Sequence, residues 1–315
     1  MFFFLPILLA GALQSAAPPT VSAPQAPSAP SYVPVRVFDT KAGAFVDFEV
    51  MLASAAKADL IFVGEQHNDP NTHRLEAALL DGLHRRKVRP VVSLEMFERD
   101  VQPVIDSYLS GQTPEEEFQK TARPWPRYGT DYRALVEAAK QHGWTVVAAN
   151  VPRRIASAVA KSGRDAIAQL PETDRPFVAR DLDCPRDTYF DRFAATMTGH
   201  PGGTQTADER QAMTERYYWA QCVKDETMAE SIVAALEKSG SPVVHYNGAF
   251  HSDFGLGTAE RVRRRAPARR VLVISMLPVA DLDTLTPSGE DLKRANYLVF
   301  TTSTPSAERA TLKSF

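Results

Sequence analysis

The sequence has few cysteines and almost no net charge. Its 315 residues include two cysteines, Cys184 and Cys222, which are too few to form a cysteine metal cluster by themselves. They fit either one disulfide in an exported protein or two buried free thiols. The formal net charge of −2 gives no broad attraction to nucleic acid or to anionic membranes. We therefore expect no nucleic-acid partner.

The first 35 residues have no charged side chain, so the basic residues that usually precede the apolar core of a secretion signal are missing. An apolar run at 2–13 is present all the same and is too short to span a bilayer. Residues 1–17 are interpreted as a signal peptide, with cleavage as late as Ala23; an uncleaved anchor is the alternative. No cysteine follows the run, so we expect a periplasmic protein without a lipidation cysteine.

The rest of the chain has an ordinary globular composition, with 44% hydrophobic and 23% charged residues. Residues 18–34 are rich in Pro, Ala and Ser and are interpreted as a flexible linker. Residues 35–301 are expected to form a single domain, and residues 302–315 a flexible tail.

Short apolar runs alternate with helical patterns along this domain. We interpret five of them as strands, at 60–63, 90–94, 144–149, 242–246 and 270–275. Short apolar strands separated by helices are typical of an α/β fold with a mainly parallel sheet flanked by helices.

Other segments complete the predicted domain. Residues 35–39 and 44–48 are expected to form a hairpin, and 297–300 an edge strand. Residues 165–238 contain no convincing strand and predict an inserted helical region, which ends in a long helix from about 207. The arginine-rich run at 261–270 is interpreted as a solvated helix end.

Polar side chains follow four of the predicted strands. In chain order they are Glu65 and His67, then Glu95, then Asn150 and Arg153, and finally Asn247 and His251. In open parallel sheets, ligands bind beyond the carboxyl ends of the strands. We therefore expect these groups to converge on one crevice.

The loop Gly64-Glu65-Gln66-His67 is the strongest single signal. Gly64 allows a sharp turn or a close approach to a ligand. Glu65 and His67 are two residues apart, so both can face one side of an extended segment. A carboxylate with a neutral imidazole suits acid–base catalysis, and with His251 it suits a divalent metal. The alternative is that Glu65 only orients His67 or caps the next helix.

Glu95 ends an apolar strand, where burying a carboxylate is costly unless it is paired. Arg153, His67 and a metal are the candidate partners, and a purely structural pair with Arg153 is the alternative. On the long helix, Gln221 and Asp225 are four residues apart and share a face that could close over the crevice. An amphipathic helix with exposed polar groups explains that pair equally well.

The positions of the remaining histidines in the predicted elements indicate which are buried and which are exposed. His245 lies within a strand and is assigned to the core, whereas His73 begins a helix that points to the crevice. His84, His142 and His200 are assigned to the surface. The segment 125–128 (WPRY) is interpreted either as a wall for a flat ligand or as a packed loop.

Five segments occur in order over about residues 35–300 and together resemble one family. They are 61–69 (IFVGEQHND), 93–98 (SLEMFE), 150–153 (NVPR), 221–229 (QCVKDETMA) and 247–251 (NGAFH). The set resembles the ChaN family of haem-binding uptake proteins, in the wider Tiki/TraB/erythromycin-esterase-like superfamily. The resemblance implies an α/β fold with an inserted helical region and a role in haem or iron acquisition.

The resemblance also implies that haem is held by a tyrosine at a homodimer interface, and tyrosinate is a suitable ferric-haem ligand. The candidates for haem binding are Tyr132, Tyr189, Tyr217 and Tyr218, with Asn247, Gln221 and Asp225 beside them. The superfamily's enzymes imply instead a hydrolytic site at Glu65, His67, Glu95 and His251. The missing lipidation cysteine sets the chain apart from the family's lipoproteins.

The sequence supports three hypotheses. The first is an exported haem- or iron-binding accessory of iron uptake, working with outer-membrane uptake machinery. The second is a metal-assisted or acid–base hydrolase in which Glu65 or Glu95 is the base and Arg153 anchors the substrate or an oxyanion. The third is a carbohydrate- or peptide-binding scaffold without chemistry.

Overall fold

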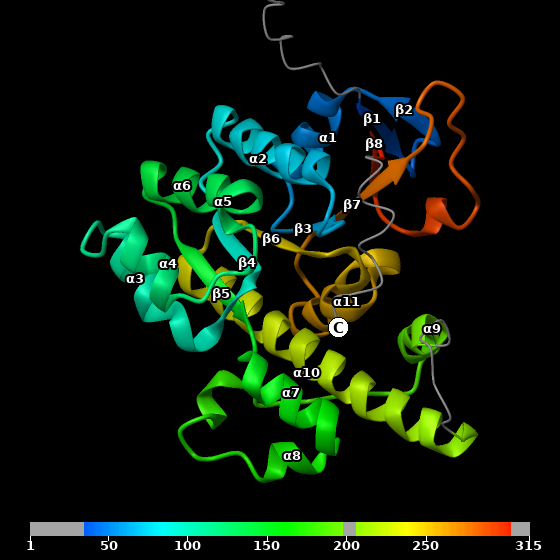
Figure 1. Cartoon of the computed structure of the whole chain (residues 1–315). Coiled ribbons are helices and arrows are strands. Elements are labelled where there is room, and N and C mark those ends of the chain that lie inside the picture. The colour runs from blue at the N-terminus through cyan, green and yellow to red at the C-terminus, as the bar shows by residue number, and fades with distance from the viewer. Residues whose placement is uncertain (1–34, 198–205, 304–315) are drawn as a thin grey trace, which may run out of the picture. The chain divides into compact units, whose positions relative to one another are not determined.

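One mixed sheet organises the part of the chain that the computed structural model describes, residues 35–197 and 206–303 (Figure 1). Its strands are β1 (Val35–Asp39), β2 (Ala44–Val46), β3 (Leu60–Glu65), β4 (Val91–Glu98), β5 (Val146–Asn150), β6 (Val243–Gly248), β7 (Val271–Val279) and β8 (Tyr297–Thr302). Their order across the sheet is β2-β1-β8-β7-β3-β6-β4-β5. Strands β8 to β5 in this order are parallel, and β1 pairs antiparallel with both β8 and β2. The predicted α/β class is confirmed.

Helices connect the strands and cover the sheet. They are α1 (Phe48–Ala55), α2 (Pro70–Arg85), α3 (Gln102–Leu109), α4 (Glu115–Thr121), α5 (Tyr128–Asp131), α6 (Arg133–His142), α7 (Arg153–Ser162), α8 (Asp165–Ala168), α9 (Thr188–Met197), α10 (Ala207–Ser239) and α11 (Gly257–Arg265). In the described residues, none of them is both long enough and apolar enough to cross a membrane.

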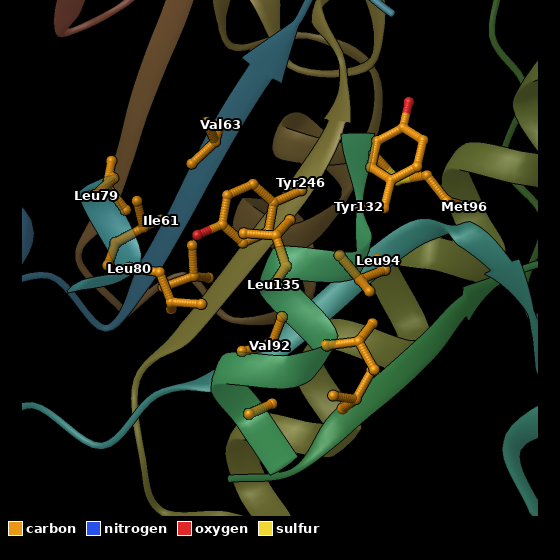
Figure 2. Packing of buried hydrophobic residues seen from close by; sticks show 14 of the residues in the cluster. Ile61, Val63, Leu79, Leu80, Val92, Leu94, Met96, Tyr132, Leu135 and Tyr246 are labelled. Carbon is orange, nitrogen blue, oxygen red and sulfur yellow. The ribbon is translucent and has the colours of Figure 1, made fainter. Parts of the chain in front are cut away.

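Successive side chains of the central strands face two different cores, because alternate residues of a strand point to opposite sides of the sheet. Ile61 and Val63 of β3 join the core under α1 to α6, where Leu135 and Tyr246 also lie (Figure 2). Leu60 and Phe62 face α10 and α11 instead. Strands that are buried on both faces need apolar residues throughout, which is why they read as continuous apolar runs in the sequence.

Helix α10 is the predicted long helix. It begins with a capping box between Thr206 and Glu209 and ends at Gly240, whose φ of 64° is in the left-handed region. Ile232 and Leu236 of its second half pack on the sheet. Helix α7 packs against α10, and α8 packs against α7 (Figure 1). The predicted helical region is therefore no separate appendage, since α10 itself covers one face of the sheet.

Two predictions about individual strands were wrong. Strand β8 is not an edge strand, because β1 pairs with it antiparallel and the hairpin of β1 and β2 forms the edge. Strand β4 continues to Glu98, so Glu95 lies inside the strand and not after it. The predicted signal peptide, the linker, most of the predicted tail and His200 lie outside the described residues.

The region around α10 and α11 decides two further questions. Cys184 and Cys222 form a disulfide, which joins the segment before α9 to α10, so the alternative of free thiols is wrong. The basic run at 261–270 is not uniformly solvated as predicted, because Arg261 is only 2% exposed and forms an ion pair with Glu226.

Candidate functional site

Glu65 is the last residue of β3 and is buried. Its Oε1 accepts hydrogen bonds from the Tyr132 hydroxyl, at 2.8 Å, and from His67 Nδ1. Beside it, a Cβ at Gly64 would come within 3.1 Å of the Ala249 Cα. The glycine therefore allows the close approach of the backbone that follows β6.

His67 is the open part of this site, with 39% of its side chain exposed. Its Nε2 lies so close to the Gly248 Cα that an added Cβ would be 2.7 Å away. The half-buried Trp125 meets the imidazole edge to face, with ring centroids 5.0 Å apart. Arg127 donates a hydrogen bond to the carbonyl of His67. The segment 125–128 is thus a packed loop, and it also walls one side of His67.

Glu95 and His251 form a second carboxylate–imidazole pair. Glu95 Oε2 accepts the Gly248 amide at 2.8 Å, and its Oε1 lies 3.3 Å from His251 Nε2. The other nitrogen, His251 Nδ1, lies 2.7 Å from Asp225 Oδ1. Thr258 donates to the same Asp225 oxygen at 2.7 Å. The result is a buried row of Asp225, His251 and Glu95 that connects α10 to the end of β6 and to the interior of β4.

The electrostatics of the two pairs follow from burial and charge. Burial alone would lower the pKa of His251, but the carboxylates of Glu95 and Asp225 outweigh it and raise that pKa to about 10. Burial disfavours the ionised form of Glu95, whereas the neighbouring positive charge of His251 favours it. The second effect is larger, so the pKa of Glu95 lies far below its usual range. His67 also has a raised pKa, because its hydrogen bond to Glu65 and the charges of Glu65 and Glu95 outweigh desolvation. Both imidazoles are therefore stabilised as cations between anionic carboxylates.

Amide and hydroxyl groups fix this row in place. Gln221 Nε2 donates to the Tyr189 hydroxyl at 3.1 Å, and that hydroxyl donates to Asp225 Oδ2 at 2.8 Å. Asn150 Nδ2 donates to the Glu95 carbonyl at 3.0 Å. Asn247 lies one residue before Gly248 and donates to the Ser252 hydroxyl at 3.0 Å. The polar face predicted for Gln221 and Asp225 is therefore buried against the site.

Arg153 is the predicted site residue that the structure does not place at the site. It begins α7, is exposed, and forms no ion pair with Glu95 in the described residues. The partner of Glu95 is instead His251, which was not among the predicted partners Arg153, His67 and a metal. His245, in contrast, is buried in the core as predicted, and burial lowers its pKa to about 3.

The predicted metal set of Glu65, His67 and His251 is not gathered. The nitrogens of His251 face Asp225 and Glu95, and His67 Nδ1 bonds Glu65. The structure instead brings together Glu65, His73 and Glu76. Within the described residues, this is the group of side chains close enough to bind one metal ion. The spacing of His73 and Glu76, three residues apart on a helix, was a signal that the sequence analysis missed.

The comparisons with known proteins decide the family. The sequence profile of the ChaN family, haem-binding uptake proteins of the Tiki superfamily, matches residues 51–262 of 315. The chain belongs to the ChaN family. Among curated proteins, no sequence matches this ChaN-family chain.

Solved structures share the fold. ChaN of Campylobacter jejuni, in a structure of cofacial heme binding, has a TM-score of 0.63 at 17% identity, over 85% of this chain and 97% of that one. The type III effector HopBA1 has a TM-score of 0.45 at 11% identity, over 81% of this chain and 92% of that one. The erythromycin esterase EreC has a TM-score of 0.43 at 12% identity, over 82% of this chain and 80% of that one. The first likeness shows that this ChaN-family chain has the ChaN fold, and the other two are too remote to support an argument.

Proposed function

We propose that this protein is an exported haem-binding accessory of iron uptake, and that Tyr217 is its axial haem ligand. The observation that carries the proposal is membership of the ChaN haem-binding uptake family over residues 51–262. The bound group would be haem with ferric iron, for which a tyrosinate is a suitable protein ligand.

The choice of Tyr217 rests on the state of the four candidate tyrosines. Tyr132, Tyr189 and Tyr218 are at most 2% exposed, and their hydroxyls donate to Glu65, Asp225 and the Pro185 carbonyl. Tyr217 on α10 is 41% exposed and has no hydrogen-bond partner in the described residues. An iron outside the fold would therefore reach Tyr217 without breaking a buried hydrogen bond. A ligand exposed in this way also suits haem shared by two copies of the chain.

The disulfide supports the exported location. Cys184 and Cys222 are joined, and structural disulfides persist in oxidising compartments such as the periplasm. With the predicted signal peptide, this favours delivery of haem on the far side of the inner membrane, where outer-membrane uptake machinery is the expected partner.

Replacing Tyr217 by phenylalanine is expected to weaken haem binding and to remove the spectral signature of a tyrosinate ligand. Titrating haemin into the wild-type chain should give a saturable Soret band with tyrosinate charge-transfer absorption. Tyr217→Phe should bind at least about tenfold more weakly, which corresponds to about 1.4 kcal/mol, and should lack the charge-transfer band.

Tyr297→Phe is the control, because its hydroxyl bonds Ser54 at 2.7 Å on a different part of the sheet. The proposal is wrong if the wild type shows no spectral change at stoichiometric haemin. An unchanged spectrum in Tyr217→Phe alone would reject the axial ligand and keep haem binding.

The two carboxylate–imidazole pairs favour a second candidate function, acid–base hydrolysis. His67 is exposed beside the buried row of Asp225, His251 and Glu95, so it could pass a proton to or from a bound ester. In that case His67→Ala should lower turnover of an aryl-ester panel by about 10²- to 10⁴-fold. His84→Ala, exposed on α2, should leave turnover unchanged, and equal rates in both variants would rule this function out.

A further inference from the structure

A buried group of potential metal ligands lies around the second carboxylate oxygen of Glu65, which does not bond His67. Glu65, His73 and Glu76 each offer one ligand atom, and these atoms lie within 4.8 Å of one another. His73 Nδ1 is 3.0 Å from Glu76 Oε2 and 3.4 Å from Glu65 Oε2. The two carboxylate side chains are 0% exposed, and the imidazole is 3% exposed. The group connects the end of β3 to the first turns of α2.

Two of the carboxylate oxygens in this group accept no hydrogen bond. They are Glu65 Oε2 and Glu76 Oε1, both fully buried. A buried polar oxygen without a partner is costly, and a bound ion is one of the explanations for such an atom in a native protein. Glu65 Oε2 faces His73, because its other oxygen is already occupied by Tyr132 and His67. The unpartnered oxygen is thus directed into the group.

The orientation of His73 fits a metal ligand. Its Nε2 lies 3.2 Å from the His67 carbonyl and 3.5 Å from Asp131 Oδ2, which are two acceptors for a ring N–H. Its Nδ1 faces the carboxyl groups of Glu65 and Glu76. Metal-bound histidines usually donate their other ring N–H to a carbonyl or a carboxylate in this manner.

We propose that Glu65, His73 and Glu76 bind a divalent transition-metal ion such as Zn²⁺ or Mn²⁺. One imidazole and two carboxylates form a ligand set for ions of this class. The ion would give the two unpartnered oxygens a partner and would hold Glu65 through Oε2. The other oxygen of Glu65, Oε1, bonds His67. The site does not include Tyr217, so the metal site and haem binding can be tested separately.

Metal analysis of the untagged full chain tests the site. The wild type is stripped with EDTA, incubated with Zn²⁺ or Mn²⁺ separately, desalted and measured by elemental analysis and calorimetry. We expect one retained ion per chain. An anomalous difference map at the metal edge should place it among Glu65, His73 and Glu76.

Glu76→Gln keeps the shape of the side chain, and we expect it to weaken binding at least about tenfold. His84→Asn is the matched control on the same helix. Its exposed ring stacks on His142 at 3.8 Å, and this surface pair could collect ions by itself. The control should keep the buried ion at full occupancy.

The proposal is overturned if the wild type retains neither ion, if the anomalous peak lies at His84 and His142, or if Glu76→Gln and His73→Asn both bind as tightly as the wild type. Circular dichroism of the metal-free variants checks that they fold. If Glu76→Gln does not fold, His73→Asn replaces it, and the position of the anomalous peak in the wild type decides by itself.

Discussion

Replacing Glu226 by glutamine is expected to destabilise the fold by about 3 to 5 kcal/mol, the usual cost of removing one partner of a buried ion pair. Glu226 is fully buried in α10 and forms ion pairs with Arg261, Arg264 and Arg265 of α11. The amide would leave three neighbouring guanidinium groups without their shared anion. Arg261 suffers most, because it is itself only 2% exposed.

Urea unfolding followed by circular dichroism measures this cost, with the disulfide intact in all samples. Glu215→Gln is the matched control on α10, since Glu215 pairs with Arg186 where both side chains are solvent-accessible. Its loss should cost about 1 kcal/mol or less. Equal destabilisation by the two substitutions would show that burial does not govern the Glu226 cluster.

Stability is also expected to fall as the pH rises from about 6.5 towards 10, through the deprotonation of His251. In the unfolded chain this imidazole loses its proton near its ordinary pKa of 6.5, whereas in the folded chain its pKa is about 10. Its contribution is therefore complete below pH 6.5 and is lost as the pH approaches 10. The slope is about −1.4 kcal/mol per pH unit, or up to about 5 kcal/mol in total.

Urea unfolding between pH 6 and 9.5 measures that slope. His67 has a raised pKa and adds to it in the same direction. Asp225 and Glu95 have lowered pKa values, so their contributions are lost in acid and leave this window unaffected. Asp225→Asn removes one of the two anions that hold the His251 proton, and the slope should become shallower. A flat profile in the wild type would contradict the assignment of a cationic His251.

The candidate site shows how far local sequence signals extend. Glu65, Glu95 and His251 were predicted to converge because parallel strands end at a common edge, and the structure places them together. That rule predicts a region and not the pairs within it, so the candidate partners of Glu95 were Arg153, His67 or a metal, and His251 was not among them. Only the path of the chain after β6, and the position of Asp225 on α10, decided for His251.

The four tyrosines illustrate the same limit. Nothing in the local sequence separates Tyr217 from Tyr218, which are adjacent. On a helix, neighbouring residues point about 100° apart, so one is buried against Pro185 and the other faces solvent. Which of them faces outward depends on what packs against α10, and the sequence alone does not provide this.

The sequence by itself determined the α/β class, most strands, the long helix and the family, because hydrophobic periodicity and short motifs are local properties. Tertiary structure alone decided that β8 is an interior strand, that Cys184 and Cys222 are joined, and that Arg261 is buried. It also brought Glu76 behind Glu65. Each of these outcomes depends on which distant segments meet, and the pairing of distant segments has no signature in any one stretch of the chain.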